Sequence, residues 1–156
     1  PILPWQVLLL RIGGATILCG LIGAEREWRG RAAGLRTHIL VGLAAAVYTL
    51  IMLELVSRAD GYPDIARTDP LRIVEAVTGG VAFLAAGLIV FTGDKVRGLT
   101  TGAGLWLSGA VGLAVGLGLW PLAGLTTLLA LVVIHMLARL EAKVRPGDRT
   151  GDQTGV

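Results

Sequence analysis

Charge is what this sequence has least of for its length. Only 16% of the 156 residues are Asp, Glu, Lys or Arg, whereas 54% are hydrophobic and the mean hydropathy is +0.73. A water-soluble domain of this size needs more polar side chains to cover its core. The composition therefore argues against a soluble domain and predicts a protein whose solvent is lipid.

Cysteine and catalytic side-chain patterns are also scarce. The one cysteine, Cys19, lies inside an apolar run, so no internal disulfide can form and a small buried packing residue is expected. The chain has no pairing of a nucleophile with a base and no dense metal-ligand motif. We therefore predict that the protein is not an enzyme and that no cofactor is certain, with Mg²⁺ as the one ion to consider.

The basic residues are placed between the apolar runs. The net charge is +3 and the pI is about 9.6, which in a soluble protein would suggest nucleic acid. Here the Lys and Arg residues form short clusters that flank apolar segments, and this pattern is typical of membrane proteins. Membrane lipid is the partner that the pattern predicts, and nucleic acid is not.

Five apolar segments predict an all-α bundle of about five transmembrane helices. A helix rises about 1.5 Å per residue, so about 20 residues cross the hydrocarbon core. No β structure is expected, because open strands leave backbone groups unpaired in lipid. Asp69 before Pro70 predicts the start of the third helix, with Asp69 as its cap and Arg72 in its first turn. The predicted helices are 3–24, 37–56, 70–91, 97–118 and 121–138; the transmembrane domain is 1–141, and 142–156 is expected to be a polar disordered tail.

The loop charges predict the orientation. On a five-helix topology, ten basic residues fall on one side and only three, Arg58, Arg67 and Arg72, fall on the other. Because Lys and Arg are enriched on the cytoplasmic side, the N-terminus is expected outside and the C-terminus in the cytoplasm. The ten are Arg26, Arg29, Arg31, Arg36, Lys95, Arg97, Arg139, Lys143, Arg145 and Arg149.

Glycine is abundant, with 23 residues, and part of it is periodic. Gly104, Ser108, Gly112 and Gly116 recur every four residues on one face of the fourth segment. In lipid, such small residues allow helices to approach closely. Packing within the chain is the simpler interpretation, and a homodimer through Gly-rich helix faces is the alternative.

Three charges lie within the apolar segments. On helices, Arg11, Glu54 and Glu75 all fall about 21 to 24 Å from the expected cytoplasmic level. One interpretation is that each side chain extends to the outer interface. The other is that Arg11 pairs with Glu75 or Glu54 and closes or lines an outward-facing cavity.

A charge cluster joins the first two segments. Glu25 and Glu27 each have an arginine four residues later, Arg29 and Arg31, which predicts a salt-bridged helix end. The predicted functional cluster on the cytoplasmic side combines this segment with the start of the fourth helix. Its members are Glu25, Arg26, Glu27, Arg29, Gly34, Arg36, Thr37, His38, Arg97, Thr100 and Thr101.

Two ligands would fit this cluster. Arginine and threonine at helix starts resemble a site for an anion or a lipid headgroup, because helix N-termini carry partial positive charge. Glu25, Glu27 and Asp94 could instead offer oxygen ligands to a hydrated Mg²⁺. The sequence leaves both open.

Several motifs resemble the transmembrane domain of the MgtC/SapB family. They are residues 20–27 (GLIGAERE), 33–41 (AGLRTHILV), 69–72 (DPLR), 83–87 (FLAAG) and 96–106 (VRGLTTGAGLW). The similarity runs from about Leu8 to Glu141 in the family's order. The sequence departs from the family in two places. Ala32 stands where the family usually has Pro, and residues 82–87 are AFLAAG where the family has the glycine-rich pattern GFLGAG.

The resemblance implies a bacterial inner-membrane protein. The family is associated with growth at low magnesium and with survival in host cells, as a regulator or adaptor more than as a proven transporter. The soluble C-terminal domain of larger members is not in this sequence, so its role is not carried over.

Three functions follow from these observations. The first is a membrane regulator that contacts itself or another membrane protein complex. The second is a small transporter or channel for Mg²⁺ or another ion, and the third is a lipid or anion binder.

Overall fold

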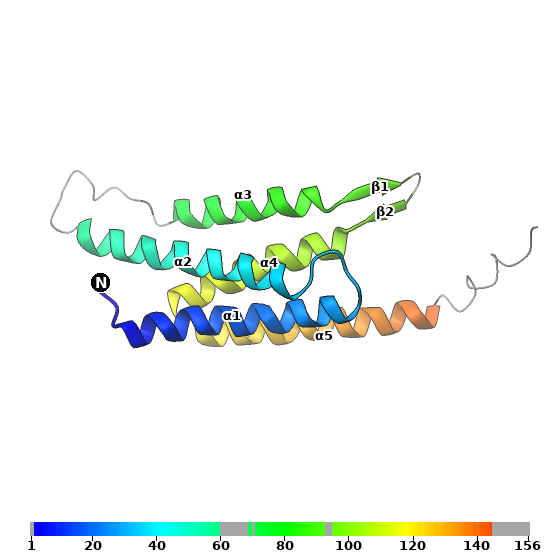
Figure 1. The fold of residues 1–156 in the computed structure, drawn as a ribbon, viewed down its shortest axis with the longest axis horizontal. Coiled ribbons are helices and arrows are strands. Elements are labelled where there is room, and N and C mark those ends of the chain that lie inside the picture. Colours follow the sequence, from blue (N-terminus) through cyan, green and yellow to red (C-terminus); the bar gives the residue numbers. More distant parts are fainter. Residues whose placement is uncertain (1, 60–68, 70, 93–94, 145–156) are drawn as a thin grey trace, which may run out of the picture.

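A computed structural model describes residues 2–59, 69, 71–92 and 95–144 of the chain. Consecutive helices run antiparallel in one elongated bundle (Figure 1), which agrees with the predicted all-α membrane fold. The elements in order are α1 (Trp5–Trp28), α2 (Leu35–Ala59), α3 (Leu71–Gly87), β1 (Val90–Thr92), β2 (Lys95–Arg97), α4 (Leu99–Leu117) and α5 (Trp120–Val144).

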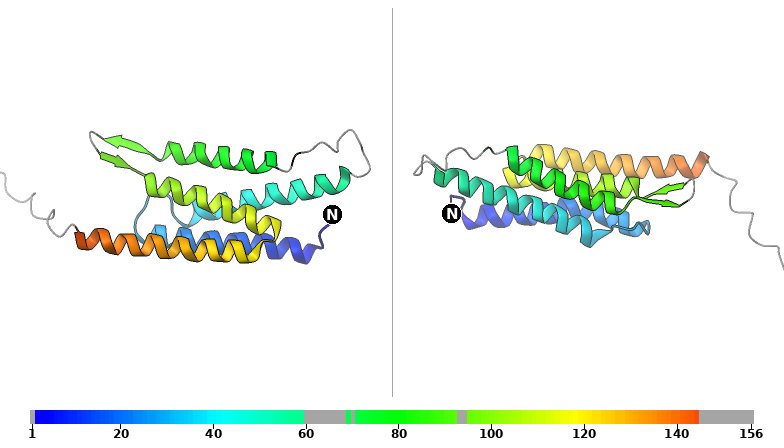
Figure 2. Two further views of the ribbon diagram at one scale, coloured as in Figure 1. Left: turned by 180° about the vertical axis from the view of Figure 1, so that it is seen from behind. Right: turned by 90° about the horizontal axis from the view of Figure 1, so that it is seen from above.

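Helix α4 lies at the centre of the bundle. It packs against each of the other four helices, whereas α2 and α3 barely touch each other. The left view in Figure 2 agrees with this layering, with α3 on one side, α1 and α5 on the other, and α2 and α4 between them. We call the end that carries the α1–α2 connection, β1, β2 and the C-terminal end of α5 the basic end (Figure 1).

Within the part of the chain that the structure describes, three helices are long and apolar enough to cross a membrane. They are Trp5–Trp28, Leu35–Arg58 and Leu99–Leu117. The apolar stretch Trp120–Met136 of α5 and the 17-residue α3 are shorter, at the lower limit for a spanning helix. Of the predicted tail 142–156, residues 142–144 continue α5, and the remainder lies outside the described residues.

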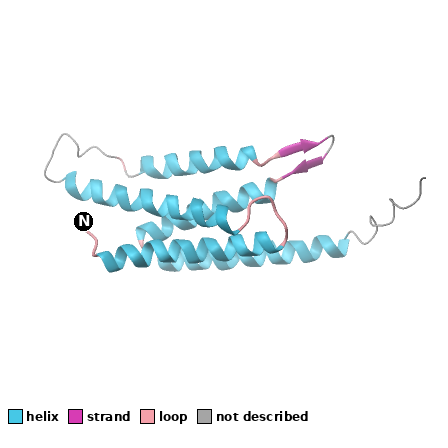
Figure 3. Ribbon diagram, in the orientation of Figure 1, coloured by secondary structure: helices cyan, strands magenta, loops and turns pink. Residues whose placement is uncertain are grey.

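The prediction of no β structure is wrong at one place. The predicted helix 70–91 ends at Gly87, and β1 and β2 then form an antiparallel hairpin, with Val90 opposite Arg97 (Figure 3). The hairpin projects beyond the ends of α3 and α4. The argument from unpaired strand edges applies to the hydrocarbon core, and a hairpin past the helix ends escapes it.

Gly98 makes the hairpin compatible with α4. It is the N-cap of α4 and has a φ of 90°, which side-chain-bearing residues rarely adopt. A Cβ at this position would also collide with the carbonyl group of Leu88, the first residue after α3. The chain can therefore turn from β2 into α4 only with glycine here.

The helix starts and ends show two different caps. The predicted cap at Asp69 is confirmed, because its Oδ1 accepts a hydrogen bond from the backbone N–H of Leu71 at 3.0 Å. At the same end of the bundle, α4 ends at Gly118, which has a φ of 81°. This is the usual left-handed glycine that ends a helix.

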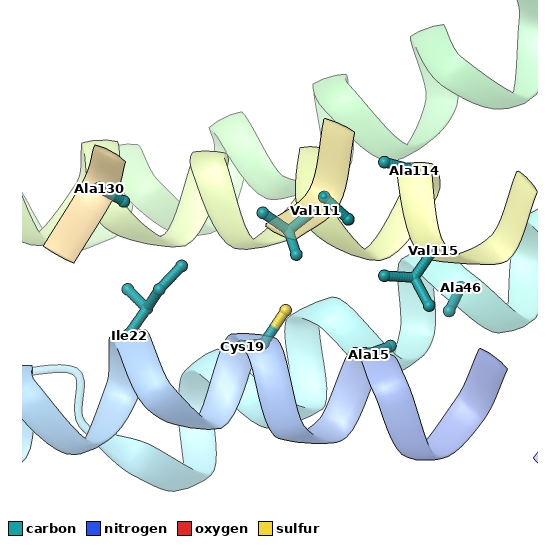
Figure 4. Close-up of a cluster of buried hydrophobic side chains, with 9 residues drawn as sticks. Ala15, Cys19, Ile22, Ala46, Val111, Ala114, Val115 and Ala130 are labelled. Atoms are coloured by element: carbon teal, nitrogen blue, oxygen red, sulfur yellow. The ribbon is translucent and has the colours of Figure 1, made fainter. Parts of the chain in front are cut away.

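Small residues form the core between α1, α2 and α4. One buried cluster combines Ala15, Cys19 and Ile22 of α1 with Val111 and Val115 of α4 (Figure 4). The predicted small-residue ladder of α4 is fully buried within the chain. Its packing inside the monomer confirms the simpler of the two interpretations of that ladder.

The closest approach joins α2 and α4. A Cβ on Gly112 would lie 2.9 Å from the Cβ of Ala45 and would collide with the carbonyl oxygen of Gly42. One turn further, a Cβ on Gly116 would lie 2.6 Å from the Cβ of Thr49. The two backbones are therefore in contact, which is how helices gain packing energy in lipid.

We predict that Gly112→Ala destabilises the bundle by about 1–3 kcal/mol, because the added methyl group forces α2 and α4 apart. Unfolding of the purified protein in mixed micelles, titrated with a denaturing detergent and followed by circular dichroism, measures this. Gly124→Ala is the matched control, since nothing lies within 4 Å of a Cβ there. Equal unfolding midpoints for the two variants would contradict the prediction.

Candidate functional site

A buried arginine marks the basic end of the bundle. Arg26 lies near the end of α1, and only 2% of it is exposed. Its Nη2 donates a hydrogen bond to the Oγ1 of Thr101 at 2.8 Å, in the first turn of α4. An arginine side chain stays charged in proteins, so a full positive charge lies between α1 and α4.

His38 is buried beside this charge. It belongs to α2 and has no exposed surface, and its Nδ1 lies 2.8 Å from the carbonyl oxygen of Gly34. A carbonyl oxygen can only accept, so Nδ1 carries the proton and the Nε2 of the neutral ring is an acceptor. That Nε2 faces Gly104, where a Cβ would lie 3.2 Å away.

The α1–α2 connection explains why His38 and Arg26 come together. Glu27, near the end of α1, accepts a hydrogen bond from the backbone N–H of Leu35 at 2.7 Å, the first residue of α2. A Cβ on Gly34 would lie 2.6 Å from the Oε2 of Glu27, so glycine is needed for this contact. A carboxylate at a helix N-terminus also stabilises the helix dipole.

The predicted ion pairs are half right. Glu25 and Arg29 form the expected pair along α1. The pair of Glu27 with Arg31 is not formed, because Glu27 turns to the start of α2 and Arg31 is exposed. Spacing along one helix could not reveal this, since the competing donor belongs to the next helix.

Arg29 also connects α1 to α5. Its Nη2 lies 3.2 Å from the Nδ1 of His135. A hollow of about 360 Å³, lined by Glu25, His135 and apolar residues of α5, lies beside this contact. The contact holds the two helices together near the basic end.

Four buried polar atoms have no hydrogen-bond partner within the described residues. They are the Nε of Arg26, the Nε2 of His38, the Oε2 of Glu25 and the Oγ of Ser108. Ser108 lies one turn beyond Gly104 on α4, and its backbone carbonyl oxygen faces the Sγ of Cys19 at 3.5 Å. The unpaired donors and acceptors thus extend from the basic end into the core between α1, α2 and α4.

The predicted functional cluster divides into two parts. Arg26, His38 and Thr101 are buried together between α1, α2 and α4. Four others, Arg36, Thr37, Arg97 and Thr100, are exposed on the surface, and Arg29 is half-buried beside Glu25. Helix periodicity separates them, because Thr37 and His38, or Thr100 and Thr101, point to different faces.

The predicted intramembrane charge set does not come together. The Nη1 of Arg11 donates a hydrogen bond to the carbonyl oxygen of Gly116 at 2.6 Å. Glu54 accepts hydrogen bonds from Arg58 and from the backbone N–H of Ile2. Glu75 is exposed on α3, as is Arg72. Among the described residues, no ion pair joins Arg11 to either glutamate.

Arg11 instead stabilises the end of α4. The carbonyl oxygens in the last turn of a helix lack partners within the helix, and they carry partial negative charge. The guanidinium group of Arg11 donates a hydrogen bond to the carbonyl oxygen of Gly116 and lies close to Gly118. The sequence carries no signal for a backbone partner on another helix, which is why this contact could not be predicted.

Two of the three candidate Mg²⁺ ligands contact protein groups. Glu25 pairs with Arg29, and Glu27 binds the backbone of Leu35. Asp94 lies outside the described residues. Across the part of the chain that the structure describes, no three His, Cys, Asp or Glu side chains are grouped closely enough to hold a metal ion.

Comparison with known proteins gives a consistent result. A model of the MgtC family matches residues 12–143. "Putative magnesium transporter YhiD" of Escherichia coli K12 is 37% identical over 137 residues, which cover 83% of this chain and 61% of that protein. "Protein MgtC" of Salmonella typhimurium is 42% identical over 136 residues, covering 87% of this chain and 54% of that protein.

A further relative, "Protein MgtC" of Brucella abortus, is 40% identical over 129 residues, covering 83% of this chain and 50% of that protein. The chain therefore spans about half to three-fifths of the length of these relatives. No solved structure matches. The family match covers most of the chain, including the segments that supply Arg26, His38 and Thr101, and the chain belongs to the MgtC family.

Proposed function

We propose that this protein is a regulator or adaptor of the bacterial inner membrane that acts by contact with other membrane proteins. Its role would be in adaptation to low magnesium and survival in a host, without transporting an ion itself. Membership of the MgtC family supports a membrane protein whose relatives carry magnesium-related names. The link to low magnesium and host survival is what the family resemblance implies, and the choice of a regulator over a transporter is our inference from the geometry of the bundle.

The observation that carries the proposal is the buried charge of Arg26 at the start of α4. The N-terminus of a helix carries partial positive charge, and Thr101 fixes the guanidinium group beside it. Two positive charges repel strongly where water is excluded. A Mg²⁺ ion moving between α1, α2 and α4 would have to pass this point, so the basic end disfavours cation transport.

The packing of α2 against α4 points the same way. The Gly42–Gly112 contact and the Gly116–Thr49 contact bring the two backbones together over two successive turns. An ion path between α2 and α4 would require the two helices to separate, which would break the contacts that hold α4 in place. The interior of the bundle therefore favours a structural role over a conducting one.

The outer surfaces offer the contacts that an adaptor needs. Helix α5 exposes Leu122, Leu125, Leu129, Val132 and Val133. Glycines 79 and 87 of α3 have nothing within 4 Å of an added Cβ, so another helix could approach them closely. A homodimer through such a surface is part of the proposal, as is a contact with a different membrane protein.

A magnesium transporter is the alternative function. The printed name of the E. coli relative, "Putative magnesium transporter YhiD", favours it. The two functions differ in whether the protein itself moves Mg²⁺ across a membrane, so flux separates them directly.

We predict that the purified chain, reconstituted in liposomes that contain a Mg²⁺-sensitive dye, admits Mg²⁺ no faster than protein-free liposomes do. The reason is the electrostatic barrier at Arg26. A Mg²⁺ ionophore added at the end of each trace serves as the positive control. Saturable Mg²⁺ entry that requires the protein would establish the transporter instead.

In the source bacterium, we predict that deletion of the gene slows growth in low-Mg²⁺ medium while the initial rate of Mg²⁺ uptake stays unchanged. A regulator alters the response to scarce Mg²⁺ without supplying an uptake route. Growth curves and uptake of a magnesium isotope measure the two quantities. A deletion strain that loses uptake in proportion to growth would contradict the regulator proposal.

Thr101→Val tests the contact at the centre of the site. We predict a loss of about 1–3 kcal/mol in the free energy of unfolding, because a buried guanidinium N–H loses its hydrogen-bond acceptor. Thr101→Ser retains the acceptor and should stay near the wild type. Thr100→Val makes the same change at an exposed neighbour and should alter stability by less than about 0.5 kcal/mol. Equal losses at both positions would rule out a special role for the Arg26 contact.

A further inference from the structure

A groove runs between α2 and α3 on the surface of the bundle. Its volume is about 760 Å³, and it is lined by residues of these two helices. It forms because α2 and α3 both pack on α4 while barely touching each other. This size lies in the range of small-ligand sites, which are also mostly apolar with a few polar groups at defined positions.

The floor of the groove is apolar and rigid. Val41 and Ala45 of α2 and Val77 and Val81 of α3 are buried in one cluster. Leu105 and Leu113 of α4 belong to the same cluster, so the floor rests on the central helix. The groove is therefore a fixed feature of the fold.

The polar groups of the groove gather at its basic end. Arg36 and Thr37 line this end, and Tyr48 is the single polar residue further along the lining. Arg36 is exposed, and within the described residues its side chain has no ion pair or hydrogen bond. A free guanidinium group at the mouth of an apolar groove suits an occupant with an anionic head and an apolar tail.

The length of the groove selects among such occupants. Arg36 and Tyr48 are twelve residues apart on α2, which is about 18 Å along a helix axis. One leaflet of the hydrocarbon core is about 15 Å thick, half of the whole core. A helix that crosses the membrane would need a groove about twice as long, whereas a single acyl chain of one leaflet fits.

The expected orientation places this leaflet on the cytoplasmic side. The ten basic loop and tail residues predict that the basic end faces the cytoplasm. Anionic lipids are attracted to basic pockets between transmembrane helices on that side. Charge, length and apolar lining thus agree on one class of ligand.

We propose that the α2–α3 groove binds an anionic phospholipid, with its phosphate on Arg36 and Thr37 and one acyl chain along the floor. The guanidinium group donates two parallel hydrogen bonds to phosphate oxygens, and the Thr37 hydroxyl donates a third. This site does not depend on the proposed regulatory function, because it holds for a transporter as well.

Native mass spectrometry of the whole protein tests the head of the proposed lipid. The probes are phosphatidylglycerol and phosphatidylcholine with identical acyl chains, titrated in a neutral detergent. We expect phosphatidylglycerol to bind about tenfold more tightly, and Arg36→Gln to remove this preference. Arg31→Gln is the matched control, because Arg31 is exposed near the same end but does not line the groove.

A second pair of variants tests the tail. Gly80 lines the groove, and nothing lies within 4 Å of a Cβ there, so Gly80→Leu fills the groove without a clash at the Cβ. Gly79→Leu makes the same change beside it, outside the lining. We expect Gly80→Leu to weaken binding of both lipids several-fold and Gly79→Leu to leave it unchanged.

Four outcomes would overturn the proposal. Equal binding of the two lipids to the wild type, or equal effects of Arg36→Gln and Arg31→Gln, would remove the role of the charge. Equal effects of Gly80→Leu and Gly79→Leu would remove the groove as the site. Loss of a dimer in Gly80→Leu with unchanged lipid adducts would make the groove an interface between copies. Thermal unfolding is measured for every variant as the control that it is folded.

Discussion

Close contact between the backbones of α2 and α4 is the constraint on which the rest of the bundle depends. Gly112 lies against the carbonyl oxygen of Gly42, and no side chain separates the two helices there. In lipid, apolar side chains gain little by leaving their solvent, so packing and hydrogen bonds hold helices together. Because the glycines at this contact have no side chains, α4 can lie at the centre of the bundle, where it packs against all four other helices.

The polar interior follows from this central position. Because α4 is close to α1 and α2, Thr101 can accept a hydrogen bond from Arg26, and Gly104 leaves room for the ring of His38. At the opposite end, the last turn of α4 receives Arg11 on the carbonyl oxygen of Gly116. Both ends of α4 are therefore held by arginines of α1, one through a side chain and the other through the backbone.

The outer helices have a different character. Helix α3 packs mainly on α4 and leaves an apolar groove beside α2, with Arg36 at its basic end. The hairpin of β1 and β2 then returns the chain to α4 through Gly98. The helices α1, α2 and α4 thus form a tightly packed core. The surface between α2 and α3 is more open, and lipid or protein can contact it there.

Sequence alone determined that the protein belongs in a membrane, the number of helices, the helix cap at Asp69 and the family resemblance. These properties are local: apolar runs, clustered Lys and Arg, and short motifs can be read along one segment. The ladder from Gly104 to Gly116 was also visible, because its four-residue period depends on one helix only. The family match over residues 12–143 confirms the resemblance.

Only the tertiary structure decided which polar groups meet. Arg26 and Arg36 both lie in the same basic segment, yet one is buried on Thr101 and the other is free at a groove. Glu27 binds the start of α2 instead of Arg31, and Arg11 finds a backbone carbonyl instead of Glu54 or Glu75. The physical reason is that partners on different helices depend on the rotation and depth of each helix, and glycine contacts between helices set both.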